Sequence, residues 1–285
     1  MTLAVPTPSV FPLAWIALTP LIVQARWSSP REAALAFFIA GWLSHALLVR
    51  WILVQVYWAG GWAIVGQVFL TAMYGAFWAA VGYVWRYASR DSGGATAALM
   101  FAFLWAGMEW AQHTTINVFG GPASLAYSQG ENIWVLQWAS LGGVGLIGYF
   151  MALVNGFGAA LFEPGRQRWV AAGGAVAVLV LTHVVGRSLL DDAAYGENPF
   201  VVGMYQSDYP IEMKHDSEYR FDMVDKATQK SIVLGENYDL DLMIWPEALI
   251  MTTIERGDIA ASLREFGMTV GCPLFTGAAR SQRIP

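Results

Sequence analysis

Charged side chains are scarce in this sequence, and that scarcity excludes several classes of protein. Only 13% of the 285 residues are charged, whereas about 25% is typical of a soluble domain. The net charge is −5 and no run of Lys or Arg is present, which excludes a basic nucleic-acid-binding protein. A chain with 56% hydrophobic residues does not stay expanded in water, so disorder is excluded as well.

Cysteine and histidine are also rare. The single cysteine has no partner for a disulfide and cannot build a cysteine-based metal site. Of the four histidines, His113 and His215 are not spaced as a metal pair, while His45 and His183 lie in apolar runs and are expected to pack with a satisfied polar tip. We therefore expect neither a metal nor a cofactor.

What the chain does contain is unevenly distributed. Residues 1–190 hold 13 of the 14 Trp and no Lys, and their net charge is +3, whereas residues 191–285 have a net charge of −8. The mean hydropathy of the chain is +0.45. The sequence therefore predicts a helical membrane domain over residues 1–190, followed by a water-soluble acidic domain over residues 191–285.

About six segments are apolar enough to be candidate membrane spans, since a helix needs about 20 mainly apolar residues to cross a bilayer. They are Phe11–Ala25, Ala33–Val49, Gly61–Trp85, Ala95–Glu109, Ile133–Leu161 and Trp169–Gly186. The first is the weakest because it is short and contains Pro20. The Trp-rich positions 42, 51, 58, 62, 78 and 85 are expected to form an interfacial belt.

Six of the eight arginines in this region follow the first, third and fifth predicted spans. They are Arg26, Arg31, Arg86, Arg90, Arg166 and Arg168. Because positively charged loops stay in the cytoplasm, the arginine-rich side is predicted to be cytoplasmic. With six spans, the tail after Arg187 then lies outside the cytoplasm. Arg50, on the opposite side, is expected to reach the lipid headgroups.

The soluble part alternates between strand and helix patterns. Strands are expected at Pro199–Gln206, Leu240–Trp245 and Met268–Gly277, with helices at Asp216–Asn237 and from Asp258 to Gly267. This β-α-β-α-β order predicts a parallel sheet in an α/β layer fold. Such a sheet would leave one face bare. Either the domain is incomplete at Pro285, or a partner or the membrane domain covers that face.

Glu247 is the sharpest candidate for chemistry, because Trp245-Pro246-Glu247 follows a buried strand. Open α/β sheets place reactive groups just beyond the carboxyl ends of their strands. A carboxyl held there beside an indole would be partly desolvated and suited to act as a general base. The alternative is a carboxylate that begins a helix and is favoured by its dipole.

Glu109 and Cys272 are weaker candidates. Glu109 ends a predicted span, where an acid is a functional candidate by default, although a hydrogen-bonded structural carboxylate explains it equally well. Cys272 has no basic neighbour to favour its thiolate, so it is expected to be a buried structural residue.

An ordered series of short motifs runs through nearly the whole chain. The series comprises Phe11–Leu18 with Pro20-Leu21, Trp105 with Glu109-Trp110, Tyr127-Ser128-Gln129, Gln137–Leu146 with Asn155, Gln206, Lys214, Trp245-Pro246-Glu247 and Thr276-Gly277-Ala278. In this series the chain resembles the bacterial apolipoprotein N-acyltransferases. The resemblance implies a polytopic α-helical membrane bundle followed by part of an extracytoplasmic nitrilase-like domain, an α/β fold of the αββα sandwich type.

The resemblance implies a Glu-Lys-Cys triad with its general base at Glu247, acting without a cofactor in the bacterial cytoplasmic (inner) membrane. The acyl donor is a phospholipid, and the acceptor is the amine of the diacylglyceryl-modified N-terminal cysteine of an apolipoprotein. The lysine and cysteine of the triad belong beyond Gly277-Ala278, so residues 1–285 are expected to be a fragment that is inactive by itself.

Several positions depart from the family pattern. His215 stands after Lys214 where the family usually has Trp, and it is the candidate substrate contact. Gln112 replaces an Arg, and Val118–Pro122 replaces a Gly-Phe-Pro-Trp motif. The alternative function is a non-catalytic, lipid-binding membrane protein with a degenerate outer domain.

Overall fold

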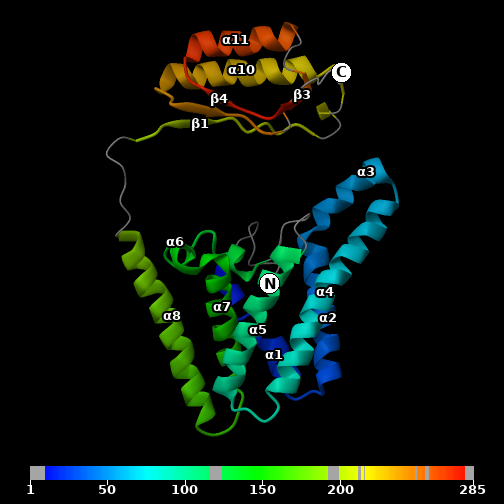
Figure 1. Ribbon diagram of the computed structural model, residues 1–285, viewed down its shortest axis with the longest axis vertical. Helices are drawn as coiled ribbons and strands as arrows, with labels where there is room; N and C mark the ends of the chain where they lie inside the picture. The colour runs from blue at the N-terminus through cyan, green and yellow to red at the C-terminus, as the bar shows by residue number, and fades with distance from the viewer. Residues whose placement is uncertain are drawn as a thin grey trace. The chain divides into compact units, whose positions relative to one another are not determined.

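The computed structural model describes residues 10–115, 124–191, 199–210, 213–214, 216–247, 249–253 and 257–279. The chain forms two compact units, Met1–Ala193 and Ala194–Pro285. The first is helical. The second carries a small parallel sheet with two long helices (Figure 1).

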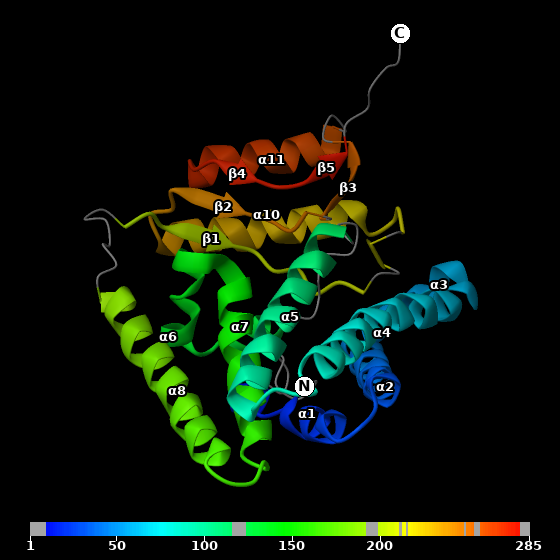
Figure 2. The same ribbon diagram turned by 60° about the horizontal axis from the view of Figure 1, so that its bottom comes forward.

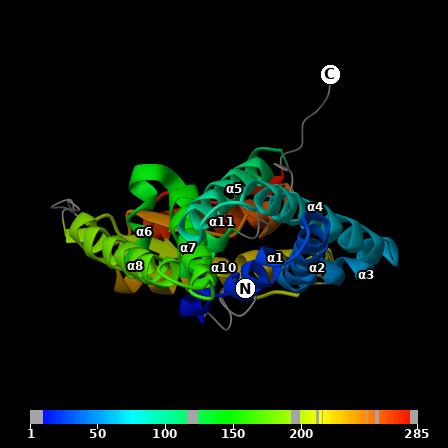
Figure 3. The same cartoon turned by 90° about the horizontal axis from the view of Figure 1, so that it is seen from below.

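The first unit consists of long helices joined by short helical turns. In chain order these are η2 (Phe11–Trp15), α1 (Thr19–Arg26), α2 (Pro30–Leu48), η3 (Arg50–Gln55), α3 (Val56–Ala59), α4 (Trp62–Ala88), α5 (Gly94–Thr115), η4 (Leu125–Gln129), α6 (Ile133–Leu136), α7 (Ala139–Ala160) and α8 (Gln167–Asp191). Seen from below, α5 and α7 lie between α8 on one side and the α2–α4 hairpin on the other (Figure 3).

Three helices in the described part of the chain are long and apolar enough to cross a membrane, namely α4, α7 and α8. The predicted spans Ala33–Val49 and Ala95–Glu109 are also helices, α2 and α5, but they are not among these three. Their role as spans stays a prediction.

Two predicted spans are not continuous helices. The segment Phe11–Ala25 divides into η2 and the eight-residue α1, which at 1.5 Å per residue extends only about 12 Å. The segment Ile133–Leu161 is broken between α6 and α7, and again inside α7 at Gly142 and Gly143. Gly143 has a φ of 64°, a conformation that glycine adopts without strain.

Helix α2 shows how local sequence sets a boundary. Ser29 Oγ accepts a hydrogen bond from Glu32 N, and Ser29 N donates to Glu32 Oε2 at 2.8 Å. Pro30 occupies the first helical position, where its missing N–H costs nothing. The reciprocal pair satisfies backbone groups that would otherwise be left open at the start of the helix.

Helices α2 and α4 pack closely because small residues on each face large ones on the other. An added Cβ at Gly41 would lie 2.7 Å from the Trp78 ring, and one at Gly82 would lie 2.7 Å from the Phe37 ring. Trp78 is consequently buried in the helical core, and Trp85 is also buried, with its Nε1 donating to Ala97 O at 2.8 Å, so the interfacial belt predicted for both is wrong. Trp51 and Trp62 are exposed, as a belt requires.

The second unit contains α10 (Arg220–Asn237) and α11 (Gly257–Val270) with five short strands. These are β1 (Val202–Met204), β2 (Leu242–Ile244), β3 (Ile250–Thr253), β4 (Leu274–Phe275) and β5 (Ala278–Ala279). Strands β1, β2 and β4 form one parallel sheet, as the sequence predicts, and they lie in that order. The second, two-stranded parallel sheet of β3 and β5 was not predicted.

Both helices cover the same face of the β1-β2-β4 sheet (Figures 1 and 2). Each helix packs an apolar side inward, since Met223, Val224 and Ala227 of α10 are buried with Ile259 and Phe266 of α11. Apolar residues in and beside the strands remain exposed: Phe200 at 68%, Met204 at 75% and Phe275 at 68%. The sheet therefore has one helix-covered face and exposed apolar side chains that the helices do not cover.

Candidate functional site

The carboxyl ends of the three parallel strands bring Glu247 and two neighbouring segments to one edge of the sheet. Tyr205 follows β1, Trp245-Pro246-Glu247 follows β2, and Thr276-Gly277 follows β4. Backbone hydrogen bonds continue across this edge, since Tyr205 N donates to Ile244 O and Trp245 N donates to Phe275 O, both at 2.9 Å. The segments that leave the sheet are thus still held beside one another.

Glu247 lies in a turn with an exposed side chain, and the nearby Trp245 is held firmly in the core. The Trp245 ring is only 2% exposed, and its Nε1 donates to Ser231 Oγ of α10 at 2.9 Å. Its centroid lies 5.9 Å from that of Phe266 in an edge-on contact. The expected partial burial of the Glu247 carboxyl beside this indole is wrong, because the indole turns into the core while the carboxyl faces solvent.

The backbone of Glu247 lies against Gly277. A Cβ at Gly277 would overlap the carbonyl oxygen of Glu247 and would lie 3.0 Å from its Cα and its carbonyl carbon. The β3–β5 pair, which begins with Ile250 opposite Ala278, holds the two segments at this separation. The site is therefore built from two turns that touch through their backbones.

Tyr205 adds a neutral hydroxyl to the same edge. Burial, together with a hydrogen bond to Tyr209, raises the pKa of Tyr205 to about 12, so the phenol keeps its proton at neutral pH. The candidate substrate contact His215 lies outside the described residues. Its neighbour Lys214 is half-buried in a short helical turn, and its backbone N donates to Pro210 O at 3.2 Å.

Cys272 lies between α11 and β4 with a buried thiol. Burial raises the pKa of this thiol, which disfavours the thiolate that a nucleophile needs. This environment agrees with the predicted packing role. Among the residues that the structure describes, no three His, Cys, Asp or Glu side chains are grouped to hold a metal ion.

In the helical unit, Glu109 is buried, and its carboxylate is fully engaged. Trp105 Nε1 and Leu125 N donate to Oε1 at 3.0 and 2.7 Å, and Ser124 Oγ donates to Oε2 at 3.0 Å. Three donors offset much of the cost of burying a carboxylate. Of the two alternatives for Glu109, this geometry matches the structural one, because the residue ties η4 to α5.

A second set of buried polar side chains connects residues from the beginning, the middle and the end of the helical unit's sequence. Trp15 Nε1 donates to Gln129 Oε1 at 3.1 Å, and Asn132 Nδ2 lies 3.3 Å from His183 Nε2. His183 Nδ1 lies 2.8 Å from Leu179 O, so both ring nitrogens have partners, as predicted. His45 differs: its Nδ1 lies 2.7 Å from Gly41 O, but among the described residues its Nε2 has no partner, so that half of the prediction is wrong.

Asn155 is the most heavily engaged of these side chains. Its Oδ1 accepts from Leu18 N at 2.8 Å and Thr19 N at 3.0 Å, while its Nδ2 donates to Ala14 O and Met151 O at 3.0 and 2.9 Å. A side chain of α7 therefore caps the start of α1, more than 130 residues earlier in the chain.

Sequence reasoning did not find Ser231 or the Gly277 contact. The signal for Ser231 is a hydroxyl on the buried face of an amphipathic helix, which requires a partner. No local signal marks the approach of Gly277 to Glu247, because the two residues are thirty positions apart and meet only through the unpredicted β3–β5 pair.

Comparison with known proteins places these features in a family. The family model described as "Apolipoprotein N-acyltransferase N-terminal domain" matches residues 1–157. The apolipoprotein N-acyltransferase of Geobacter metallireducens is 28% identical over 263 residues, which cover 87% of this chain and 49% of the relative. That of Chlorobaculum tepidum is also 28% identical, over 93% of this chain and 50% of the relative.

A third relative, from Gloeobacter violaceus, is 27% identical over 59% of this chain and carries the same name. The chain spans about half the length of the first two relatives. Since the family model covers more than half of the 285 residues, this chain belongs to the apolipoprotein N-acyltransferase family.

Proposed function

We propose that this protein transfers a fatty acyl group from a phospholipid to the N-terminal amine of diacylglyceryl-modified apolipoproteins, in the cytoplasmic membrane of a bacterium. The observation that carries the proposal is the family match over residues 1–157. The names of the three relatives support the same activity. Both substrates are lipid-anchored, which gives a physical reason for joining a membrane bundle to a catalytic domain.

We assign residues 191–285, which include the second unit, to a nitrilase-like domain. Its parallel sheet has both helices on one face and keeps large apolar side chains exposed at Phe200, Met204 and Phe275. Monomeric soluble proteins rarely leave such a surface uncovered. An αββα sandwich needs one sheet layer of this kind, with helices outside and an apolar face inside.

The chemistry follows the nitrilase-like pattern with Glu247 as general base. The carboxylate takes a thiol proton, the thiolate attacks the phospholipid ester carbonyl, the ester C–O bond breaks, and the departing lysophospholipid oxygen regains the proton. The acceptor amine then attacks the thioester, the C–S bond breaks, and the amine proton returns to the sulfur as the amide forms. A lysine stabilises the oxyanion in both steps. We assign this lysine and cysteine to no residue of the sequence.

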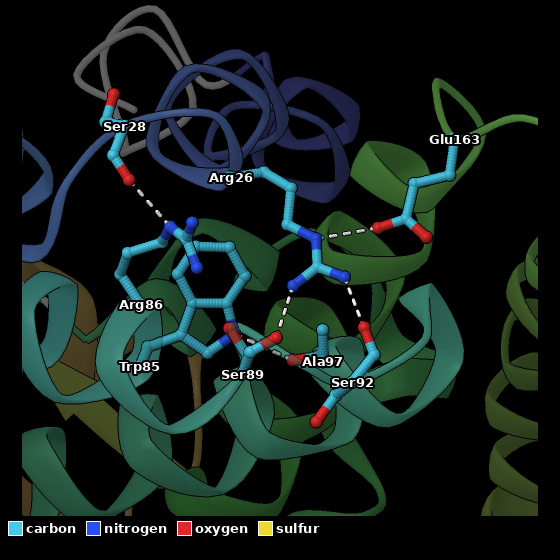
Figure 4. A network of polar contacts seen from close by, with 8 residues as sticks. All are labelled: Arg26, Ser28, Trp85, Arg86, Ser89, Ser92, Ala97 and Glu163. Carbon is cyan, nitrogen blue, oxygen red and sulfur yellow. Dashed lines mark hydrogen bonds and ion pairs between the residues drawn. The ribbon is translucent and has the colours of Figure 1, made fainter.

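The proposed orientation places the arginine-rich end of the helical unit in the cytoplasm. Arg26 Nε pairs with Glu163 Oε1 at 2.8 Å, and its other nitrogens donate to Ser89 O and Ser92 O (Figure 4). Arg86 Nε donates to Ser28 O at 2.7 Å. These bonds hold the loops after α1, α4 and α7 together at one end of the helical unit. The positive-inside rule then favours a cytoplasmic location for this end as a whole.

The activity is tested with the variant Glu247→Gln in the protein expressed in its native host. A general base contributes about 10²–10⁴-fold to rate, so the acyl-thioester, measured by mass spectrometry as a hydroxylamine-labile adduct, should form at least about 100-fold more slowly. Glu236→Gln is the matched control, because Glu236 is an exposed carboxylate near the end of α10, which in a β-α-β unit lies toward the opposite sheet edge. Equal rates in the two variants would reject Glu247 as the base.

A further inference from the structure

The contact between Gly277 and Glu247 carries an inference that rests on the proposed function. We propose that Gly277 is a positioning residue: its missing side chain sets the height at which the Glu247 carboxylate stands over the sheet edge. The residue takes no part in bond making, and its effect on the reaction passes entirely through Glu247.

The path of the chain shows how the contact arises. Segments 245–250 and 275–278 leave the first sheet side by side, joined by the bond from Trp245 N to Phe275 O. They enter the second sheet side by side as well, with Ile250 opposite Ala278. Glu247 and Gly277 lie between these two attachments, where neither segment can move away without breaking a ladder.

The need for glycine is one of space. An added Cβ at Gly277 would meet the carbonyl oxygen, the carbonyl carbon and the Cα of Glu247, and these backbone atoms cannot rotate away as the end of a side chain can. The φ of Gly277 lies outside the positive range, so its conformation is open to any residue. A methyl group at this position therefore meets Glu247 first, since its three nearest atoms all belong to that residue.

The buried residues on either side of Glu247 determine the direction in which an added Cβ would displace its backbone. Trp245 is fixed by Ser231, and Leu249 is buried, with its N bonded to Pro246 O at 3.3 Å. Because these residues flank Glu247 and are held in the core, an added Cβ moves the Glu247 backbone outward. A shift of roughly 1 Å at a reacting group costs about 100-fold in rate.

The experiment compares Gly277→Ala with Gly267→Ala in the protein as its own cell makes it. A Cβ at Gly267, on α11, meets nothing within 4 Å, so this control adds the same methyl group without a contact. Single-turnover formation of the acyl-thioester is measured against phospholipid concentration. We expect the maximal rate of Gly277→Ala to fall about 100-fold, with the half-saturating phospholipid concentration within twofold of the control, since substrate binding is untouched.

A second variant separates positioning from general damage. Glu247→Asp withdraws the carboxyl by one methylene, so its effect depends on where the backbone stands. The rate loss of the double variant, Glu247→Asp with Gly277→Ala, should differ by at least about fivefold from the product of the two single-variant losses, as it does for coupled sites.

Three results would overturn the positioning role. They are a Gly277→Ala rate within threefold of the Gly267→Ala rate, multiplicative losses in the double variant, or a Gly277→Ala protein that melts far below the control and so needs the glycine to fold. None of these touches the proposed acyl transfer, which fails separately if the wild-type protein forms no acyl-thioester with phospholipid.

Discussion

Asn155→Leu tests whether the buried cap on α1 holds the helical unit together. The substitution keeps the size of the side chain but removes its donors and acceptor. Leu18 N loses its partner at 2.8 Å, whereas Thr19 N keeps a second acceptor, Ile16 O, at 3.1 Å. Ala14 O loses the donor at 3.0 Å.

The magnitude follows from those partners. One buried N–H left open costs about 1–3 kcal/mol, and a lost bond to a buried carbonyl costs about 0.5–1.5 kcal/mol. We expect the free energy of unfolding of the helical unit to fall by roughly 2–4 kcal/mol. At about 2–4 °C per kcal/mol for a unit of this size, the melting temperature should drop by at least about 4 °C.

Tryptophan fluorescence in detergent is a suitable assay, because 13 of the 14 Trp lie in the first 190 residues and the signal reports on the helical unit. Gln24→Leu is the control: Gln24 lies on α1 itself, and its Nε2 donates to Ser28 Oγ at 2.9 Å on the exposed side. If Asn155→Leu melts within one degree of Gln24→Leu, the cap contributes nothing and the reasoning is refuted.

Two further predictions concern orientation and pH. In a Cys272→Ser background, Glu236→Cys should react with a membrane-impermeant maleimide added outside intact cells, and Arg90→Cys should react only after lysis, because the arginine-rich end is predicted to be cytoplasmic; the reverse pattern would remove the proposed site from the compartment of its substrates. Tyr205, whose pKa is raised to about 12 from 10.0, contributes stability that is fully present below pH 10 and is lost as pH rises from 10 toward 12. The ultraviolet difference between wild type and Tyr205→Phe should therefore show one tyrosine ionising near pH 12, and a midpoint near 10 would contradict the burial of this phenol.

The sequence predicts the helices well because long apolar runs leave little choice. Segments such as Gly61–Trp85 become α4 with boundaries shifted by a few residues. The break at Gly142 and Gly143 escapes prediction because two glycines in an apolar run change neither hydropathy nor its period. Strands β3 and β5 escape because two to four residues carry too little pattern to be distinguished from a loop.

The candidate site is predictable in its residues and less so in its environment. A proline after an apolar strand places Glu247 at the carboxyl edge, and the structure has it there. The direction of Trp245 depends on Ser231, fourteen positions earlier on another element. Likewise, two of the three donors to Glu109 come from Ser124 and Leu125, beyond the end of its own helix. Pairings of this kind are set by tertiary packing, which local patterns do not encode.

The interlocked pair of α2 and α4 has a consequence for how this sequence can vary. At Gly41 and Trp78, and again at Gly82 and Phe37, one residue fills the space that the other leaves empty. A larger side chain at either glycine is tolerated only when its aromatic neighbour shrinks, since the interior has no spare volume. The two members of each pair are therefore expected to change together in evolution, because a substitution at one position alone would not fit between the two helices.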